Sequence, residues 1–422
     1  MKLLTFTSLY PNAIRPSHGV FVENRLIHLV RNGRITSRVL APVPWFPSRH
    51  RRFGRYSEFA RVPDREERHG IEVRHPRYLT IPGIGIYGAP LTMALAARRT
   101  IAKLIREGER FDAIDAHYFF PDGVAAILLG RWFDLPVVIT ARGSDITWFP
   151  TQALPRRMIL WAARHAAGIV TVCRALKDEL VRLGADGEKI VVLRNGVDAK
   201  RFAPIAMRLA RERLQLPAEG KIIASVGALI PRKRHELVID ALALLPGVRL
   251  IIAGSGPLRS FLESHAARAG VADRISFLGQ MAHDDLPAVY SAADASVLAS
   301  ENEGWANVLL ESMACGTPVV ATDAGGSSEV VAAPEAGLIV RERSGAAIAA
   351  ALRNLLAASP DRAMTRGYAE RFSWDETTRG QEQVFLGLAV STKELQPSGT
   401  KQMNTLSDGD LRKASHSRPV DH

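Results

Sequence analysis

Residues 303–320 read EGWANVLLESMACGTPVV, and no other stretch of the chain says as much about the fold. The stretch follows a strand-like run at 295–298, and its two glutamates, Glu303 and Glu311, stand eight positions apart. Gly304 lets the backbone approach a ligand closely, and a helix that starts there has free N–H groups, which favour a phosphate. Two surface glutamates on an amphipathic helix would explain the pair, but they would not account for the whole stretch.

Strand-like runs alternate with amphipathic stretches on both sides of this segment. In the first half we expect strands at 3–6, 113–116, 137–140, 169–172 and 190–193, and helices at 21–30, 123–129 and 158–167. A polar stretch with prolines and glycine at 195–220 marks a crossing between domains. In the second half we expect strands at 222–226, 249–253, 275–278, 295–298, 318–321 and 337–340, then helices at 344–357 and 372–388. This alternation predicts an α/β fold with two parallel sheets in tandem and with ligands at the carboxyl ends of the strands.

Length and composition agree with two globular domains. A chain of 422 residues is too long for one ordinary core. No apolar run reaches the ~20 residues that a membrane-spanning helix needs. The two cysteines, Cys173 and Cys315, form neither a disulfide framework nor a metal-ligand cluster, which favours a cytoplasmic location.

The charge balance predicts an anionic partner. The chain has 55 Lys and Arg against 43 Asp and Glu, a net charge of +12, which would attract nucleotide diphosphates, anionic lipid or nucleic acid. Between residues 45 and 61 basic side chains are interleaved with aromatic ones, an arrangement that suits either a membrane interface or a solvated loop. The segment 91–110 favours the membrane, because it adds Arg98, Arg99, Lys103 and Arg106.

The stretch 303–320 resembles the Glu-x7-Glu signature of the retaining glycosyltransferase family 4, which has the GT-B fold. Segments 226–234, 251–259 and 277–287 are similar, in the same order, to the family's phosphate-binding segment, its glycine turn beside the nucleotide and its base-binding loop. The resemblance implies two Rossmann-like, doubly wound domains. It places an acceptor-binding domain at 1–198, a donor-binding domain at 199–371 and a helix at 372–390 that returns to the first domain. The polar tail at 391–422 is expected to be disordered.

The resemblance also implies the donor contacts. It assigns Glu303 to the transferred sugar and Glu311 to the ribose hydroxyls, and on one helix roughly 12 Å would separate them. Lys233 is the expected main diphosphate cation. Arg232 is expected to replace an arginine that many members carry where this chain has Ala228. The other expected donor contacts are Gly19, Gly254, Gly256, Leu278, Gly304, Trp305, Ala306 and Asn307.

Two segments of the first domain resemble family positions near the sugar. His117 follows the strand at 113–116 and matches a histidine that faces the transferred sugar, so it is expected to be catalytic together with Glu303. Arg142 stands where many relatives have histidine, and with Asp145 it is the expected contact for an anionic acceptor. Within the family the motifs at 10–11, 19–22, 115–118 and 142–145 are most similar to enzymes of teichuronic acid or exopolysaccharide assembly.

The implied reaction moves a glycosyl unit from a nucleoside diphosphate sugar to an acceptor hydroxyl with retention, in cell-surface polysaccharide or glycolipid assembly. No metal and no separate cofactor is expected, since Lys233, Arg232 and helix N–H groups can stabilise the leaving diphosphate. The expected partners are the donor, a saccharide or lipid-linked saccharide and the anionic inner face of the cell membrane, and not nucleic acid.

Several alternatives remain open. A nucleotide-sugar epimerase or a phosphorylase can share the architecture, although a phosphorylase would need a pyridoxal lysine that no motif indicates. A nicotinamide-dependent dehydrogenase would have a third glycine where Arg259 stands. A non-catalytic membrane-binding protein would not need Glu303, Glu311 and Lys233 together.

Overall fold

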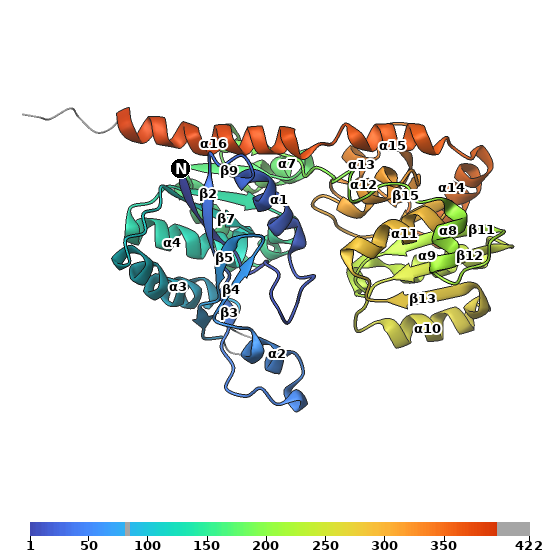
Figure 1. Ribbon diagram of the computed structural model, residues 1–422, viewed down its shortest axis with the longest axis horizontal. Coiled ribbons are helices and arrows are strands. Elements are labelled where there is room, and N and C mark those ends of the chain that lie inside the picture. Colours follow the sequence, from blue (N-terminus) through green and yellow to red (C-terminus); the bar gives the residue numbers. More distant parts are fainter. Residues whose placement is uncertain (81–84, 395–422) are drawn as a thin grey trace, which may run out of the picture.

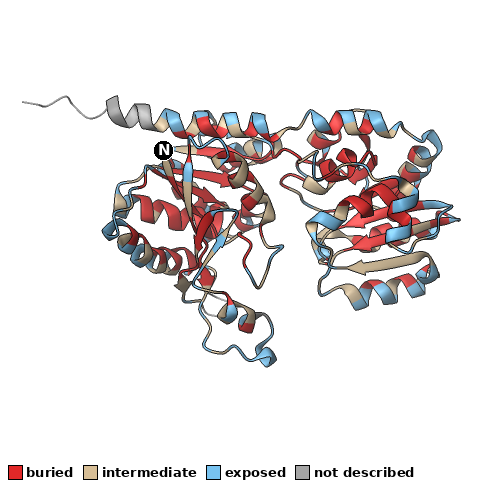
Figure 2. Ribbon diagram, viewed as in Figure 1, coloured by how far each residue is buried: buried red, intermediate tan, exposed pale blue. Residues whose placement is uncertain are grey.

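A computed structural model describes residues 1–80 and 85–394, which form two α/β units joined by a linker and by a long C-terminal helix (Figure 1). Buried residues fill the central strands of each sheet and the inner helix faces, whereas the edge strand β13 is only partly buried and exposed residues lie on the outer faces of the helices (Figure 2). The predicted GT-B architecture of two Rossmann-like domains is confirmed.

The N-terminal sheet has eight strands in the order β10-β9-β8-β7-β1-β2-β5-β4. Only β4 runs antiparallel, where it pairs with β5. The strands are β1 Lys2–Phe6, β2 Thr36–Leu40, β4 Arg65–Arg68, β5 Ile71–Arg74, β7 Ala113–His117, β8 Val137–Ala141, β9 Gly168–Thr171 and β10 Ile190–Val192. A separate two-stranded sheet pairs β3 Val43–Pro44 with β6 Arg77–Tyr78.

Two helical layers cover this sheet because successive strand residues point to opposite faces. Leu3 and Val138 belong to a core with α1 (Val20–Val30), whereas Leu4 and Ile139 pack in a core with α3, α4 and α6. These helices span Ala89–Arg106, Val124–Phe133 and Ala153–His165, and α7 spans Arg174–Leu183. The five predicted strands of this half are confirmed within one or two residues, but β2 to β6 were not predicted.

The C-terminal sheet has six parallel strands in the order β13-β12-β11-β14-β15-β16, all of them predicted. The strands are β11 Lys221–Val226, β12 Val248–Ala253, β13 Ile275–Gly279, β14 Ala295–Leu298, β15 Val319–Thr322 and β16 Gly337–Val340. The helices are α8 Met207–Arg213, α9 His235–Ala243, α10 Arg259–Arg268, α11 Leu286–Ala292, α12 Asn307–Ala314, α13 Ser327–Val330, α14 Gly345–Ala358 and α15 Arg362–Glu370.

The final helix α16 (Trp374–Glu394) returns to the N-terminal unit, as predicted (Figure 1). Its Trp374 ring stacks on His28 of α1 at 5.0 Å, and Phe385 is buried in the core beside α1. The predicted boundary of a disordered tail at 391–422 is wrong at its start, because the helix continues to Glu394. Residues 395–422 lie outside the described residues.

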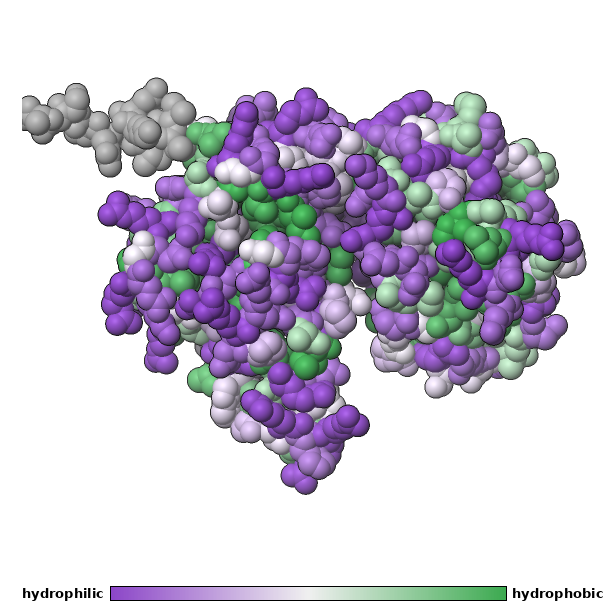
Figure 3. Space-filling model, in the orientation of Figure 1, coloured by the Kyte–Doolittle hydropathy of each residue, from purple (hydrophilic) through white to green (hydrophobic). Residues whose placement is uncertain are grey.

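A lobe formed by residues 45–61 projects from the N-terminal unit and contains α2 (Arg55–Arg61) and a short 3-10 helix, η1 (Arg51–Phe53) (Figure 1). The Phe46 ring packs on Phe53 and Tyr56 with centroids 5.4 and 5.3 Å away. Hydrophilic side chains gather at the tip of this lobe (Figure 3). Across the described residues we found no helix with the length and apolar composition that crossing a membrane requires.

Candidate active site

A cleft of about 700 Å³ lies between the two units, where the carboxyl ends of their strands meet. The N-terminal side of its wall includes Phe21, Tyr118, Arg142, Ser144, Trp148 and Asn195. The C-terminal side includes Arg232, Lys233, Glu303, Gly304, Trp305, Ala306 and Asn307, all predicted site residues. The volume is typical of a small-molecule site.

A carboxylate held by two cations forms the C-terminal side. Lys233 Nζ donates a hydrogen bond of 2.6 Å to Glu303 Oε1, and an Arg232 guanidinium nitrogen lies 3.4 Å from the same oxygen. The Glu303 side chain is only 10% exposed. Burial opposes ionisation, but Lys233 and Arg232 overcome it and lower the pKa of Glu303 below its ordinary value. Glu303 is therefore a carboxylate at neutral pH.

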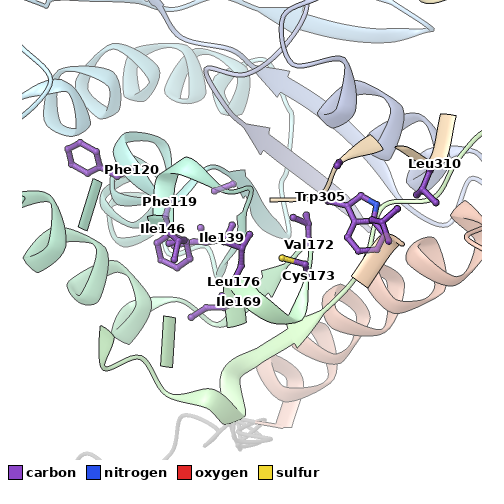
Figure 4. Close-up of a cluster of buried hydrophobic side chains, with 14 of the residues drawn as sticks. Phe119, Phe120, Ile139, Ile146, Ile169, Val172, Cys173, Leu176, Trp305 and Leu310 are labelled. Atoms are coloured by element: carbon purple, nitrogen blue, oxygen red, sulfur yellow. The ribbon is translucent and has the colours of Figure 1, made fainter. Parts of the chain in front are cut away.

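Gly304 fixes the position of this carboxylate because backbone from both units surrounds it. A Cβ at residue 304 would lie 1.8 Å from the carbonyl oxygen of Arg142, and a Cβ at Gly325 would lie 2.0 Å from that of Glu303. Neither contact leaves room for a side chain. The neighbouring Trp305 belongs to a hydrophobic cluster with Val172 and Cys173, so apolar packing also crosses the boundary (Figure 4).

The predicted position of Glu303 on a helix is wrong. Helix α12 begins at Asn307, and residues 301–306 form a loop whose Ala306 is the N-cap. The 12 Å spacing along one helix axis does not apply, because only Glu311 is helical.

Glu311 lies in a neighbouring pocket of about 140 Å³ and does not line the main cleft. Its Oε2 accepts a hydrogen bond of 3.0 Å from Tyr290, and its Oε1 lies 3.2 Å from Nε2 of His283. Asn307 lines both pockets and connects them. The two glutamates therefore face two different, adjacent spaces.

His117 is buried behind the cleft and is not among the residues that line it, so its contact with the sugar stays a prediction. Its Nδ1 lies 2.7 Å from the Arg142 guanidinium, and its Nε2 lies 3.1 Å from Asp115. Burial lowers the pKa of His117 to about 4, while Asp115 opposes this and Arg142 adds to it. A neutral His117 therefore accepts a hydrogen bond from Arg142 and positions it at the cleft wall.

Arg142 is the cationic side chain of the N-terminal wall. It lies over the Phe21 ring and 3.4 Å from Oδ1 of Asn195, and burial lowers its pKa to about 10, so it stays protonated at neutral pH. The fully buried Arg25 donates to the same Asn195 oxygen at 3.2 Å. Among the described residues Arg142 Nε has no acceptor. Two buried arginines thus share few counter-charges beside the cleft.

Asp145 holds the turn after β8 together, and its contact with the acceptor stays a prediction. It is fully buried, and its carboxylate accepts hydrogen bonds from the backbone N–H groups of Phe119, Arg142 and Gly143. Burial raises its pKa, which those backbone donors oppose. Asp145 therefore shapes the turn that carries Arg142, but it does not reach the cleft.

Four predicted donor residues also lie away from the cleft wall: Gly19, Gly254, Gly256 and Leu278. A Cβ at Gly19 would lie 2.3 Å from the Leu9 carbonyl, and one at Gly254 would lie 1.8 Å from the Gly227 carbonyl oxygen. A Cβ at Gly256 would lie 2.4 Å from the Leu229 carbonyl oxygen, and Leu278 packs against the core. These positions need small or apolar residues so that the loops can pack.

Sequence reasoning missed several residues of the N-terminal wall, among them Tyr118, Ser144 and Trp148. Tyr118 and Ser144 share a hydrogen bond of 2.6 Å, and Trp148 is 57% exposed at the cleft. Tyr118 adjoins His117, and Ser144 and Trp148 follow Arg142 closely in the chain, so their neighbours were the available signal. Asn195 was predicted only as part of a hinge, yet its Nδ2 donates to Asn307 Oδ1 across the two units at 3.2 Å.

Comparisons with known proteins agree with this geometry. A family model described as glycosyltransferase family 4 matches residues 56–201, and one described as glycosyl transferases group 1 matches residues 207–372. A D-inositol 3-phosphate glycosyltransferase of Salinispora tropica is 33% identical over 359 residues, which are 76% of this chain and 73% of the relative. Its namesake in Mycobacterium bovis is 32% identical over 333 residues, 73% and 68% of the two chains.

Solved structures show the same fold. Sucrose-phosphate synthase from Thermosynechococcus elongatus superposes with a TM-score of 0.76 at 21% identity and covers 92% of this chain and 99% of its own. HepE of Anabaena, solved in complex with UDP, gives 0.66 at 19% identity over 94% and 100%. Together with the family matches, these findings show that the chain belongs to glycosyltransferase family 4 and is a glycosyltransferase.

Proposed function

We propose that the chain transfers a glycosyl unit from a nucleoside diphosphate sugar to an acceptor hydroxyl, with retention of the anomeric configuration. The observation that carries the proposal is the contact of Glu303 with Lys233 and Arg232 in the cleft. The two cations suit a diphosphate, whose charge grows as the glycosidic bond breaks. The Glu303 carboxylate suits the positive charge that develops on the sugar.

The nucleoside end of the donor fits the pocket around Glu311. Its carboxylate accepts from Tyr290 through one oxygen, and the other lies on the side of His283, where ribose hydroxyls can donate. Asn307 connects this pocket to the cleft. A donor extending past Asn307 would reach Glu303 with its sugar and Glu311 with its ribose.

The acceptor fits the N-terminal wall, and we propose that it carries an anionic group. Arg142 offers a buried guanidinium whose Nε has no described acceptor, and the exposed Trp148 ring offers a surface for stacking a sugar ring. The relatives named as D-inositol 3-phosphate glycosyltransferases act, by name, on a phosphorylated acceptor. The acceptor class proposed here is a charged saccharide or lipid-linked saccharide of cell-surface assembly.

The donor is tested by thermal shift with UDP, GDP and ADP and their sugars. A ligand at about 100 times its Kd should stabilise the protein by about 2.7 kcal/mol, so one nucleotide should stand out. Lys233→Ala should lose this shift, whereas Lys221→Ala should keep it, because Lys221 pairs with Asp294 outside the cleft. The absence of a shift with every nucleotide would contradict the proposal.

The acceptor is tested with pairs of compounds that differ only in a phosphate, such as inositol and D-inositol 3-phosphate. The phosphorylated member should have the higher kcat/KM, and Arg142→Gln should reduce this preference without changing nucleotide affinity. Equal rates for the two members in the unaltered protein would rule out an anionic acceptor of this kind. NMR of the product anomer tests retention.

We further propose that the enzyme works at the anionic inner face of the cell membrane. The support is the projecting lobe, where Trp45, Phe53 and Tyr56 are exposed beside Arg51 and Arg52. Basic groups attract anionic headgroups, and aromatic rings settle at the bilayer boundary. Replacing both arginines with alanine should weaken binding to anionic vesicles and spare turnover on a soluble acceptor; unchanged vesicle binding would contradict this.

A further inference from the structure

A basic groove lies on the N-terminal unit, separate from the cleft. It has a volume of about 520 Å³ and shares no lining residue with the cleft. Its cationic side chains come from the β4–β5 hairpin, from β6 and from α3: Arg65, Arg74, Arg77, Arg99 and Lys103. Convergence of five cations from separate segments is a feature that neither the donor nor the acceptor explains.

Few carboxylates balance the charge of this groove. Asp64 is the acidic residue of its wall, and it is 90% exposed at 3.4 Å from Arg77. Glu72 pairs with Arg65 and Arg74 and also with Arg38, and Glu107 lies 3.7 Å from Arg74 and 3.8 Å from Lys103. Within the described residues no ion pair involves Arg99. The groove therefore keeps a positive charge that a bound anion can neutralise.

The Arg77 side chain of the groove is preorganised by hydrogen bonds within the protein. Arg77 donates hydrogen bonds to the backbone carbonyls of Phe59 and Val62, at the end of the helix α2 in the lobe. These carbonyls fix the guanidinium without neutralising it. A preorganised arginine loses little conformational entropy when it binds an anion, and its planar fork suits a phosphate.

The surroundings of the groove indicate which phosphate it binds. On the same helix as Arg99 and Lys103, Leu91 and Leu95 are 52% and 46% exposed, one helical turn apart. An exposed aliphatic row beside basic residues is typical of a helix that lies in a membrane interface. Arg77 connects the groove to the lobe, whose exposed aromatic rings suit the same surface.

We propose that this groove binds the phosphate of an anionic lipid headgroup. Arg65, Arg77, Arg99 and Lys103 contact the phosphate oxygens, while Leu91 and Leu95 rest on the neighbouring acyl chains. The inference deepens the membrane association proposed above and rests on it. It adds a defined headgroup site to a surface that otherwise meets the membrane through its charge and its exposed aromatic rings.

The test compares two double variants that each remove two positive charges, Arg99→Ala with Lys103→Ala and Arg51→Ala with Arg52→Ala. Binding is measured with phosphatidylcholine vesicles, with and without phosphatidylglycerol, and by calorimetry with a short-chain phosphatidate below its micelle concentration and with inorganic phosphate. Both variants should bind anionic vesicles roughly 30-fold more weakly, at roughly fivefold per charge. Only the groove variant should lose affinity for the short-chain lipid.

Three outcomes would overturn the groove site. If neither variant changes the affinity for the short-chain lipid, attraction to the membrane is diffuse. If the short-chain lipid does not bind the unaltered protein, there is no headgroup site. If inorganic phosphate binds as tightly as the short-chain lipid, and Leu91→Ser with Leu95→Ser leaves vesicle binding intact, the groove takes a soluble phosphate. Nucleotide affinity and turnover on a soluble acceptor, measured on the same variants, test the proposed reaction independently.

Discussion

Replacing Glu303 with glutamine should lower kcat, while the affinity for the free nucleotide should stay the same or rise. The glutamine cannot hold Lys233 as the carboxylate does, across a charge-assisted contact of 2.6 Å. Such hydrogen bonds contribute about 1.5–3 kcal/mol, so the freed lysine should bind a nucleoside diphosphate at least as well as before, and about tenfold more tightly at the lower of these values. The kcat should fall about a hundredfold or more, because the lost charge supports the transition state.

Calorimetry with the free nucleotide and steady-state kinetics with the complete donor measure these two effects. Glu301→Gln is the matched control, since Glu301 also lines the cleft but pairs with Arg234. Its kcat and nucleotide affinity should both stay near those of the unaltered protein. The reasoning is refuted if Glu303→Gln abolishes nucleotide affinity, since the carboxylate would then hold the nucleotide in place of the sugar.

Three further predictions follow from the site. Glu311→Gln should raise the donor KM a few tens-fold at nearly constant kcat, from roughly 2 kcal/mol of lost binding, and an unchanged KM would exclude the ribose contact. Turnover should persist in EDTA, since Lys233 and Arg232 face the diphosphate site, and loss restored by Mg²⁺ would contradict this. Because the folded pKa of His117 is about 4, the unfolded chain alone takes up its proton as pH falls below about 6.5. The free energy of unfolding should therefore drop by roughly 2.5 kcal/mol more, between pH 7.5 and 4.5, in the unaltered protein than in His117→Gln, as measured by urea titration.

The predictable strands were those buried on both faces of a parallel sheet. Strands such as β12 are apolar along most of their length, so their sequences stand out without any neighbouring context. Strand β4 reads REER and sits at the sheet edge, and its partner β5 carries Glu72, which several arginines surround. The pairing of β4 with β5 depends on those tertiary contacts, and no hydrophobic pattern in the sequence of β4 indicates it.

The candidate site was predictable where one segment carries it and unpredictable where two segments meet. Lys233 and Glu303 were identified from the resemblance of their own segments. The burial of His117 depends on Arg142, which stands 25 positions away and occupies its Nδ1. The loop before the helix start at Asn307 has close backbone contacts of Gly304 with Arg142 and of Glu303 with Gly325, which single-segment reasoning cannot detect.

The contact of Gly304 with Arg142 makes the spacing of the two domains and the position of Glu303 dependent on each other. The loop that carries the carboxylate is bounded on one side by its own domain, at Gly325, and on the other by the opposite domain. If the domains separate, the loop loses one of its two walls. The position of the Glu303 carboxylate is therefore fully supported only when the two domains are in contact. When the C-terminal domain stands alone, the loop that carries Glu303 lacks the wall formed by Arg142.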